Sequence, residues 1–111
     1  MAHDRCQQLR HMLEHEPGNT FLRYALALEY HKANETGQAI DLLEAIRGDA
    51  PQYLPLYYQL GRMYVAQQQL EKALAIYQAG KAVAHAQSET KTLNELEAAH
   101  EDVQDLREDM D

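Results

Sequence analysis

The sequence predicts an all-α fold, in which antiparallel helix pairs form a short solenoid of about six helices. Its clearest signal is a repeat, because residues of similar character return 34 positions further along the 111-residue chain. Leu9 returns as Leu43, and Leu26 returns as Leu60. A lag of this length fits two helices of about 14 residues and two short turns. Composition agrees, since Ala, Leu, Glu and Gln dominate as they do in helices, and no segment shows strand-type alternation.

Three helices are predicted in the N-terminal half, at about residues 4–16, 20–33 and 38–48. Each carries apolar residues at spacings of three and four positions, which places them on one helix face. A Pro-Gly-Asn sequence ends the first helix, and the polar turn at residues 34–37 separates the second from the third. The stripes consist of Leu9, Met12 and Leu13, then Leu26, Ala27 and Tyr30, then Ala39, Ile40, Leu42, Leu43 and Ile46.

Three further helices are predicted at about residues 55–68, 70–85 and 89–108. The first of these starts at Pro55, a residue that the first turn of a helix tolerates. The last has one narrow apolar stripe on an otherwise polar surface, as expected of a helix that caps a solenoid. Acidic residues at its C-terminal end oppose the helix dipole, so we expect fraying past about Arg107. The stripe of this last helix consists of Leu93, Leu96, Val103 and Leu106.

Charge is distributed unevenly along the chain. The net charge is -8, and residues 88–111 contain nine acidic and two basic residues. A surface of this sign repels phosphate backbones and anionic lipids, so we expect neither a nucleic-acid partner nor a membrane surface. The acidic segment is interpreted as a solvated helix face, with an acidic docking surface as the alternative.

Cys6 is the only cysteine, which excludes an internal disulfide and a cysteine-based zinc cluster. We interpret it as a small, partly buried apolar residue of the first helix. No apolar run has the length of a signal peptide's core or of a membrane span. The protein is therefore expected to be soluble and cytoplasmic.

Residues 57–85 carry a spaced motif of an aromatic residue, Leu-Gly, Tyr, Ala and a second aromatic residue. With this motif the chain resembles the tetratricopeptide-repeat family. The resemblance implies a right-handed solenoid of helix pairs that serves as an interaction module. The motif residues are Tyr57, Leu60, Gly61, Tyr64, Ala73 and Tyr77, with His85 in the place of the usual Pro.

A looser copy of the motif lies one repeat earlier. Gly61, and Ala27 in this earlier copy, are expected to let the two helices of a pair approach closely. Arg23 stands where an aromatic residue is usual, and it is expected to loosen the first repeat. The looser copy consists of Arg23, Leu26, Ala27, Tyr30, Ala39, Leu43 and Pro51.

The resemblance also implies how a single domain is divided. A half repeat is expected at residues 1–16, full repeats at 17–50 and 51–84, and a capping helix at 88–107.

In this family the first helix of each pair lines a concave groove, which here means the helices at 20–33 and 55–68. The resemblance therefore implies a tyrosine-lined site for an extended or helical peptide with an aromatic or aliphatic anchor and some acidic character. Alternatively, Tyr24 and Tyr58 stack on each other or cover a neighbouring helix. The expected peptide-binding residues are Phe21, Tyr24, Leu28, His31, Lys32, Tyr58, Arg62 and Val65.

His11, Glu14 and His15 form a His-x-x-Glu-His sequence, which is similar to the core of an inverted zinc-peptidase motif. A catalytic zinc needs a third protein ligand and a walled cleft, which this first helix is not expected to provide. We expect both histidines to be exposed near the C-terminus of the helix, where positive charge suits the dipole. The sequence thus predicts no catalytic residue, no metal site and no cofactor.

The favoured function is that of a non-enzymatic interaction module, monomeric or weakly self-associating, with another protein as its partner. The alternative is a structural subunit that self-associates through exposed solenoid faces. A small metal-dependent hydrolase comes third. A molecular mass that rises with protein concentration would favour the self-associating subunit. An enzymatic activity that a chelator abolishes would favour the metal-dependent hydrolase.

Overall fold

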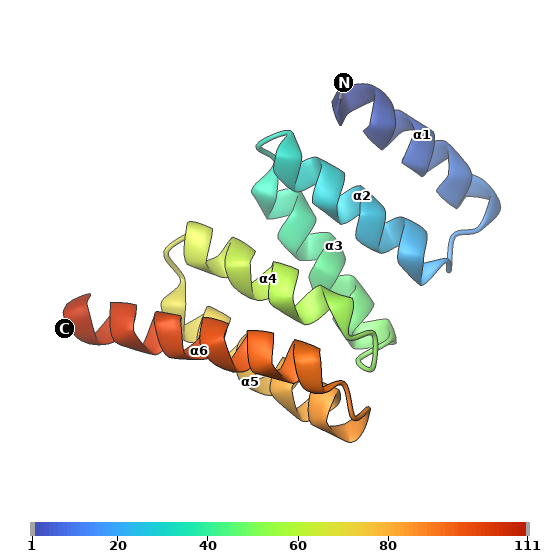
Figure 1. Ribbon diagram of the computed structural model, residues 1–111. Coiled ribbons are helices and arrows are strands. Elements are labelled where there is room, and N and C mark those ends of the chain that lie inside the picture. The colour runs from blue at the N-terminus through green and yellow to red at the C-terminus, as the bar shows by residue number, and fades with distance from the viewer. Residues whose placement is uncertain (1, 111) are drawn as a thin grey trace. The chain divides into compact units, whose positions relative to one another are not determined.

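The computed structural model describes the backbone of residues 2–110 and the side chains of residues 4–110. Over this part of the chain there are six helices and no strand (Figure 1), as the sequence predicts. The chain divides between Tyr53 and Leu54 into two compact units, which we call the N-terminal and C-terminal units.

The N-terminal unit contains α1 (Ala2–His15), α2 (Thr20–Lys32) and α3 (Thr36–Asp49). Helix α2 packs against both α1 and α3, so its apolar residues face two neighbours. Cys6 is buried in this unit rather than partly buried. The cluster around it consists of Cys6, Leu9, Leu22 and Leu26, and α3 contributes the fully buried Ala39, Leu43 and Ile46.

Two polar residues fix α2 in place. Asn19 caps its first turn, because its Oδ1 accepts a hydrogen bond from the backbone N–H of Leu22 at 2.9 Å. Arg23 was expected to loosen the repeat, but its Nη1 donates to Asp49 Oδ2 of α3 at 3.0 Å, and only 16% of its side chain is exposed. An ion pair near the surface contributes at most about 1 kcal/mol, so the covered aliphatic stem of Arg23 is the larger stabilising contribution.

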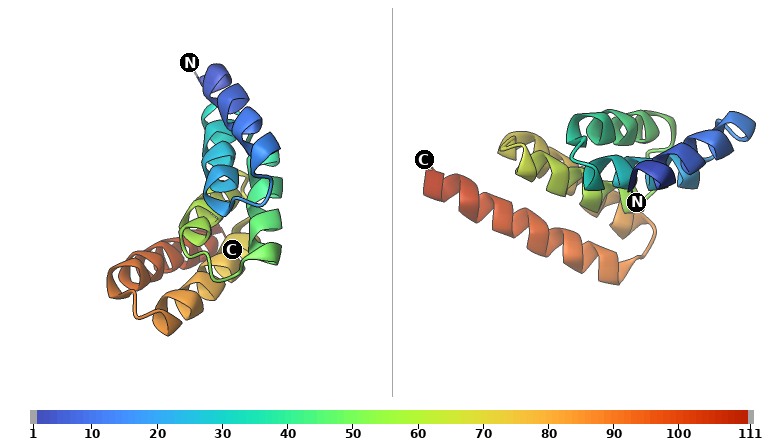
Figure 2. Two further views of the ribbon diagram at one scale, coloured as in Figure 1. Left: turned by 90° about the vertical axis from the view of Figure 1, so that its right-hand side faces the viewer. Right: turned by 90° about the horizontal axis from the view of Figure 1, so that it is seen from above.

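The C-terminal unit contains α4 (Pro55–Ala66), α5 (Leu70–Ala86) and α6 (Thr90–Met110). Helix α5 packs against α4 and α6, and α4 also contacts α6. Figure 2 shows α6 as one long, unbroken helix. The sequence predicts a helix over about residues 89–108, and the observed helix continues through Met110. Arg107 Nη1 donates to Glu71 of α5 at 3.1 Å, and fraying of the residues that follow stays a prediction.

Two glycines allow close helix contacts within this unit. A Cβ atom on Gly61 would lie 2.2 Å from the ring of Tyr77, and one on Gly80 would lie 2.6 Å from the Cβ atom of Tyr57. Real side chains do not approach so closely, so both positions require glycine as packed. The expectation that Gly61 permits a close approach is confirmed, whereas the role of Gly80 was not predicted.

Three helices end in the same way, although none of the three turns uses glycine. Asn34, Gln68 and Ser88 have φ angles of 62°, 60° and 57°, the left-handed conformation. The residue after each donates its N–H to a carbonyl five positions earlier, as in a Schellman turn. These bonds are Glu35 N to Tyr30 O at 2.8 Å, Gln69 N to Tyr64 O at 2.9 Å and Glu89 N to Ala84 O at 2.9 Å. The turn at 34–37 is shorter than predicted, because α3 already begins at Thr36.

Gln68→Gly should stabilise the protein by about 1 kcal/mol. A non-glycine residue in the left-handed conformation costs roughly 1–2 kcal/mol, and glycine removes that cost while losing some chain entropy. Gln67→Gly is the matched control, because the neighbouring Gln67 has a φ of -88° and should gain nothing. Thermal unfolding followed by circular dichroism compares the two variants. Equal melting temperatures would contradict the strain assigned to Gln68.

Candidate binding surfaces

A depression between α4 and α6 lies in the C-terminal unit, above α5. Its volume is about 230 Å³. Three of its residues were predicted as peptide-binding positions, and four were not. We call it the α4–α6 depression, and it is lined by Tyr58, Arg62 and Val65 of α4, Tyr77 of α5, and Ala99, Asp102 and Val103 of α6.

Tyr77 forms the base of the α4–α6 depression. The residue is only 2% exposed, its ring fills the space opposite Gly61, and the ring of Tyr58 lies 6.4 Å from it at 48°. Among the described residues no buried side-chain oxygen or nitrogen lacks a hydrogen-bond partner. The Tyr77 hydroxyl has no hydrogen-bond partner among the described residues and is not a fully buried atom, so it touches solvent, and Tyr77 is one of the residues that line the depression.

The Tyr77 hydroxyl is neutral at physiological pH. Burial raises the pKa of Tyr77 to about 12, with Tyr58 and Asp102 contributing in the same direction and Arg62 opposing them. A neutral phenol can both donate and accept a hydrogen bond. The base of the depression therefore offers one polar group that can act as a hydrogen-bond donor or as an acceptor.

Two opposite charges flank this hydroxyl. The guanidinium carbon of Arg62 lies 5.9 Å from the centroid of the Tyr58 ring, a cation–π distance. Arg62 and Asp102 are both exposed. Within residues 4–110 neither of them has an ion-pair partner. The depression thus carries a cation on α4 and an anion on α6 that do not neutralise each other.

Tyr77→Phe should remove part of the protein's sensitivity to alkali. Between about pH 10 and pH 12 an unfolded tyrosine has lost its proton while Tyr77 keeps its own, so stability falls as the pH rises through this window. At about pH 11 we expect the parent to lose roughly 1 kcal/mol more than Tyr77→Phe, relative to about pH 8. Urea unfolding of both proteins at the two pH values measures this, since the other tyrosines are common to both. An equal loss in the two proteins would contradict the raised pKa of Tyr77.

The predicted residues on α2 lie in the N-terminal unit. Phe21 is 63% exposed, whereas Tyr24 and Leu28 are half-buried. The Tyr24 ring meets the ring of Tyr53 edge-on, with centroids 5.5 Å apart, whereas the rings of Tyr58 and Tyr77 are tilted and lie further apart. A single groove shared by the α2 and α4 residues remains a prediction.

The two basic candidates on α2 already have local partners. His31 Nδ1 and Thr36 Oγ1 share a hydrogen bond of 3.0 Å, and Lys32 Nζ pairs with Glu29 Oε1 at 3.3 Å. The Lys32 charge is therefore partly offset by Glu29, and the His31 ring is already hydrogen-bonded within the chain.

A wider depression in the N-terminal unit has a volume of about 540 Å³. Arg10 Nη1 donates to the Tyr30 hydroxyl at 3.1 Å, and this hydrogen bond raises the pKa of Arg10. The polar groups of Arg10 and Tyr30 thus satisfy each other. The lining residues are Arg10, Leu26, Tyr30, Gln38, Asp41, Leu42 and Ala45.

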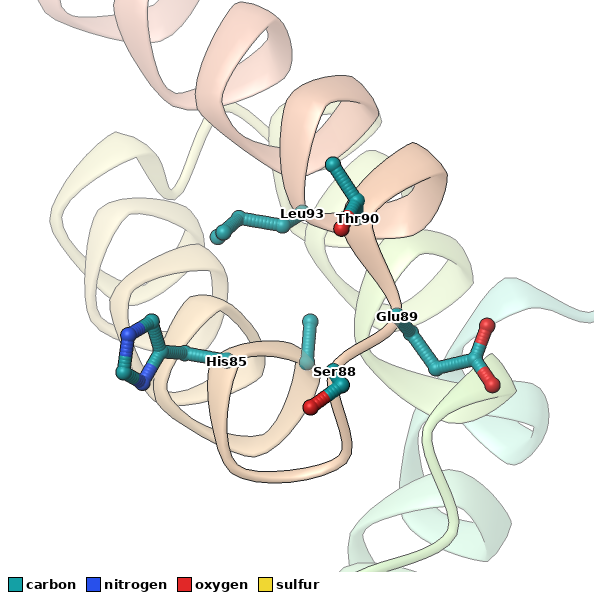
Figure 3. A pocket seen from close by; sticks show the side chains of 6 residues that line it. His85, Ser88, Glu89, Thr90 and Leu93 are labelled. Atoms are coloured by element: carbon teal, nitrogen blue, oxygen red, sulfur yellow. The ribbon is translucent and has the colours of Figure 1, made fainter.

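A third depression, of about 230 Å³, lies at the turn between α5 and α6. Its polar residues do not converge, because Figure 3 shows the side chains of His85 and Glu89 pointing to opposite sides. Ser88 and Thr90 lie between them, and Leu93 supplies an apolar wall. This arrangement gives no single point at which a ligand would meet several polar groups.

His11 and His15 are exposed near the end of α1, as predicted. His11 Nδ1 lies 3.5 Å from Glu14 Oε2, and the two imidazole rings are 5.3 Å apart. Among the described side chains no group of three or more His, Cys, Asp or Glu residues is placed to hold a metal ion. None of the described helices is long and apolar enough to cross a membrane.

Comparison with known proteins agrees with the motif. A tetratricopeptide repeat model matches residues 30–96. The solution structure of a tetratricopeptide repeat domain protein from Salinibacter ruber is 33% identical, covers 81% of this chain and 91% of its own, and superposes with a TM-score of 0.78. No curated protein sequence matches significantly.

Two more distant structures share the fold alone. A protein from Bordetella parapertussis is 24% identical, with a TM-score of 0.79 and coverage of 94% of this chain and 89% of its own. MamA from Desulfovibrio magneticus is 19% identical, with a TM-score of 0.64 and coverage of 99% of this chain and 68% of its own. Helix pairs, the spaced motif and these matches agree, and the chain belongs to the tetratricopeptide-repeat family.

Proposed function

We propose that this protein is a non-enzymatic interaction module that binds a peptide segment of another protein. The family match supports an interaction role, because solenoids of this kind use extended surfaces to bind partners. The α4–α6 depression carries the more specific proposal. It combines Tyr58, Arg62 and Val65, all on the helix expected to line the groove.

The size of the depression favours one side chain of a larger partner. Pockets for small-molecule ligands usually have volumes of about 300–1,000 Å³, and the α4–α6 depression is smaller than this range. Its walls include an aromatic ring and valines from two helices, which suit a buried anchor at the centre of an interface. We propose that the α2 residues extend the contact along the same peptide, and these are Phe21, Tyr24, Leu28, His31 and Lys32.

A Tyr24→Ala, Tyr58→Ala double variant tests the proposal. Random peptides displayed on phage are first selected against the intact protein, and the affinity of the selected peptides is then measured for each variant. We expect the double variant to keep its fold and to bind about 30-fold more weakly, since loss of a tyrosine anchor costs about 2 kcal/mol or more. Gln78→Ala, an exposed change on α5, should bind like the parent.

The other results have distinct meanings. If the double variant unfolds, the tyrosines belong to the core and only cover neighbouring helices. If it is stable and binds the selected peptides unchanged, recognition lies elsewhere, with the acidic α6 as the next surface to examine.

Self-association is the second candidate function. Its support is four exposed apolar side chains, since Met12 is 44%, Phe21 63%, Leu106 41% and Met110 68% exposed. Mass measured by sedimentation over a range of concentrations separates the two functions, because only self-association makes the mass depend on concentration.

A further inference from the structure

Three polar groups of the α4–α6 depression have no hydrogen-bond or ion-pair partner among the described residues. They are the cationic guanidinium of Arg62 on α4, the anionic carboxylate of Asp102 on α6, and the neutral hydroxyl of Tyr77 on α5. Each comes from a different helix, and Tyr77 is only 2% exposed. A buried polar side chain that opens into a depression is costly to cover unless the ligand offers it a hydrogen bond.

The two opposite charges restrict what such a ligand can be. A carboxylate would be attracted by Arg62 and repelled by Asp102. An ammonium or guanidinium group would be attracted by Asp102 and repelled by Arg62. An apolar side chain would desolvate both charges and leave the Tyr77 hydroxyl unpaired. A primary carboxamide avoids these costs, because it is neutral and carries an acceptor oxygen beside two N–H donors.

We propose that the α4–α6 depression recognises the carboxamide side chain of an Asn or Gln residue in the partner segment. Arg62 donates to the amide oxygen, Asp102 accepts from the amide nitrogen, and the Tyr77 hydroxyl completes the set. This proposal rests on the proposed function, namely that the protein binds a peptide segment. It also revises the acidic partner expected from the sequence, since Asp102 faces the same space as Arg62 and the basic residues His31 and Lys32 have local partners.

Apolar contacts fit the same ligand. Val65, Ala99 and Val103 line the depression beside the polar groups, and they suit the methylene groups of a Gln side chain. The carboxamide would thus be held at its polar end by three hydrogen-bonding groups and along its stem by aliphatic walls.

A change of peptide preference between charge variants tests the proposal. Displayed random peptides selected by the parent should be enriched in Gln or Asn at one position. Asp102→Asn leaves only the cation and should shift this position to Asp or Glu, whereas Arg62→Gln leaves only the anion and should shift it to Lys or Arg. Both residues are exposed, so both variants should fold, which circular dichroism checks. Asp105→Asn, a nearby exposed acidic position outside the depression, should keep the preference for Gln or Asn.

Synthetic peptides then show whether the bound amide belongs to a side chain or to the peptide backbone. Replacing the enriched Gln by Leu or Glu should weaken binding about tenfold or more, and Tyr77→Phe should weaken the binding of the Gln peptide severalfold. If Gln to Leu has no effect while methylation of a backbone N–H abolishes binding, the backbone amide is the ligand and the proposal is overturned.

Two other results would also overturn the proposal, and they differ in meaning. Peptides that bind without any preference for Gln or Asn would remove the carboxamide site and leave the proposed function standing. The absence of any selected peptide would remove both.

Discussion

Gly61→Ala is expected to destabilise the protein by about 2–3 kcal/mol. In an exposed helix the same change would be favourable by about 1 kcal/mol, because alanine is the better helix former. Here the new Cβ atom would lie 2.2 Å from the ring of Tyr77, which is buried and cannot move aside without disturbing α4 and α5. Overpacking of this kind typically costs 1–3 kcal/mol, and it outweighs the gain in propensity. Urea unfolding measures the difference.

A rescue variant and a control make the cause specific. Tyr77→Leu removes the ring atoms that the new methyl group would meet, so Gly61→Ala should cost much less in that background than in the parent. Gly48→Ala is the matched control, because nothing lies within 4 Å of a Cβ atom there and the change should be neutral or stabilising. If Gly61→Ala unfolds like the parent, α4 and α5 are further apart than the structure shows.

Leu96→Ala should cost about 3 kcal/mol, the other large effect. Leu96 is fully buried on α6, and its Cδ1 would lie 3.2 Å from a Cβ atom on Gly80 of α5. Truncating a fully buried leucine removes apolar contacts and leaves a cavity, which costs roughly 2–5 kcal/mol. Because α6 supplies one wall of the α4–α6 depression, the variant should also bind selected peptides more weakly.

Leu106→Ala on the same helix is the control for this change. Leu106 is 41% exposed, so the same substitution should alter stability by no more than about 0.5 kcal/mol. Thermal unfolding of the two variants under one condition tests the difference. Similar melting temperatures would show that α6 is not held to α5 through Leu96.

The fold followed from the sequence because its signals are local and repeated. Ala39 and Ala73, one repeat apart, are both fully buried. A helical period places such residues on one face whatever their neighbours are, so the helices and most of their buried stripes could be predicted. Met12 and Leu106, each assigned to a stripe, are exposed instead. Helix ends were predicted less accurately, since contacts near them, such as that of Arg107 with Glu71, join residues far apart in the sequence.

Only part of the residues that line the α4–α6 depression could be predicted from the sequence. Tyr58, Arg62 and Val65 were predicted from their helical spacing on α4, and all three line the α4–α6 depression, although their role in binding stays a prediction. Asp102 was not predicted as a residue of this surface. The repeat pattern fades in α6, and nothing in the sequence distinguishes Asp102 from the other acidic residues of that helix. Its place beside Arg62 depends on how α6 packs.

The sequence by itself determined the all-α class, the repeat, the identity of the close-packed glycine at Gly61 and the negative charge of the last helix. Only the tertiary structure decided which charges meet and which hydroxyl stays unpaired. It placed Tyr77, predicted as a motif residue, at the base of a depression, and it set Arg62 and Asp102 around the same space. The physical reason is that helix formation depends on spacing along the chain, whereas the chemistry of a site depends on side chains from separate helices and on the packing that brings them together.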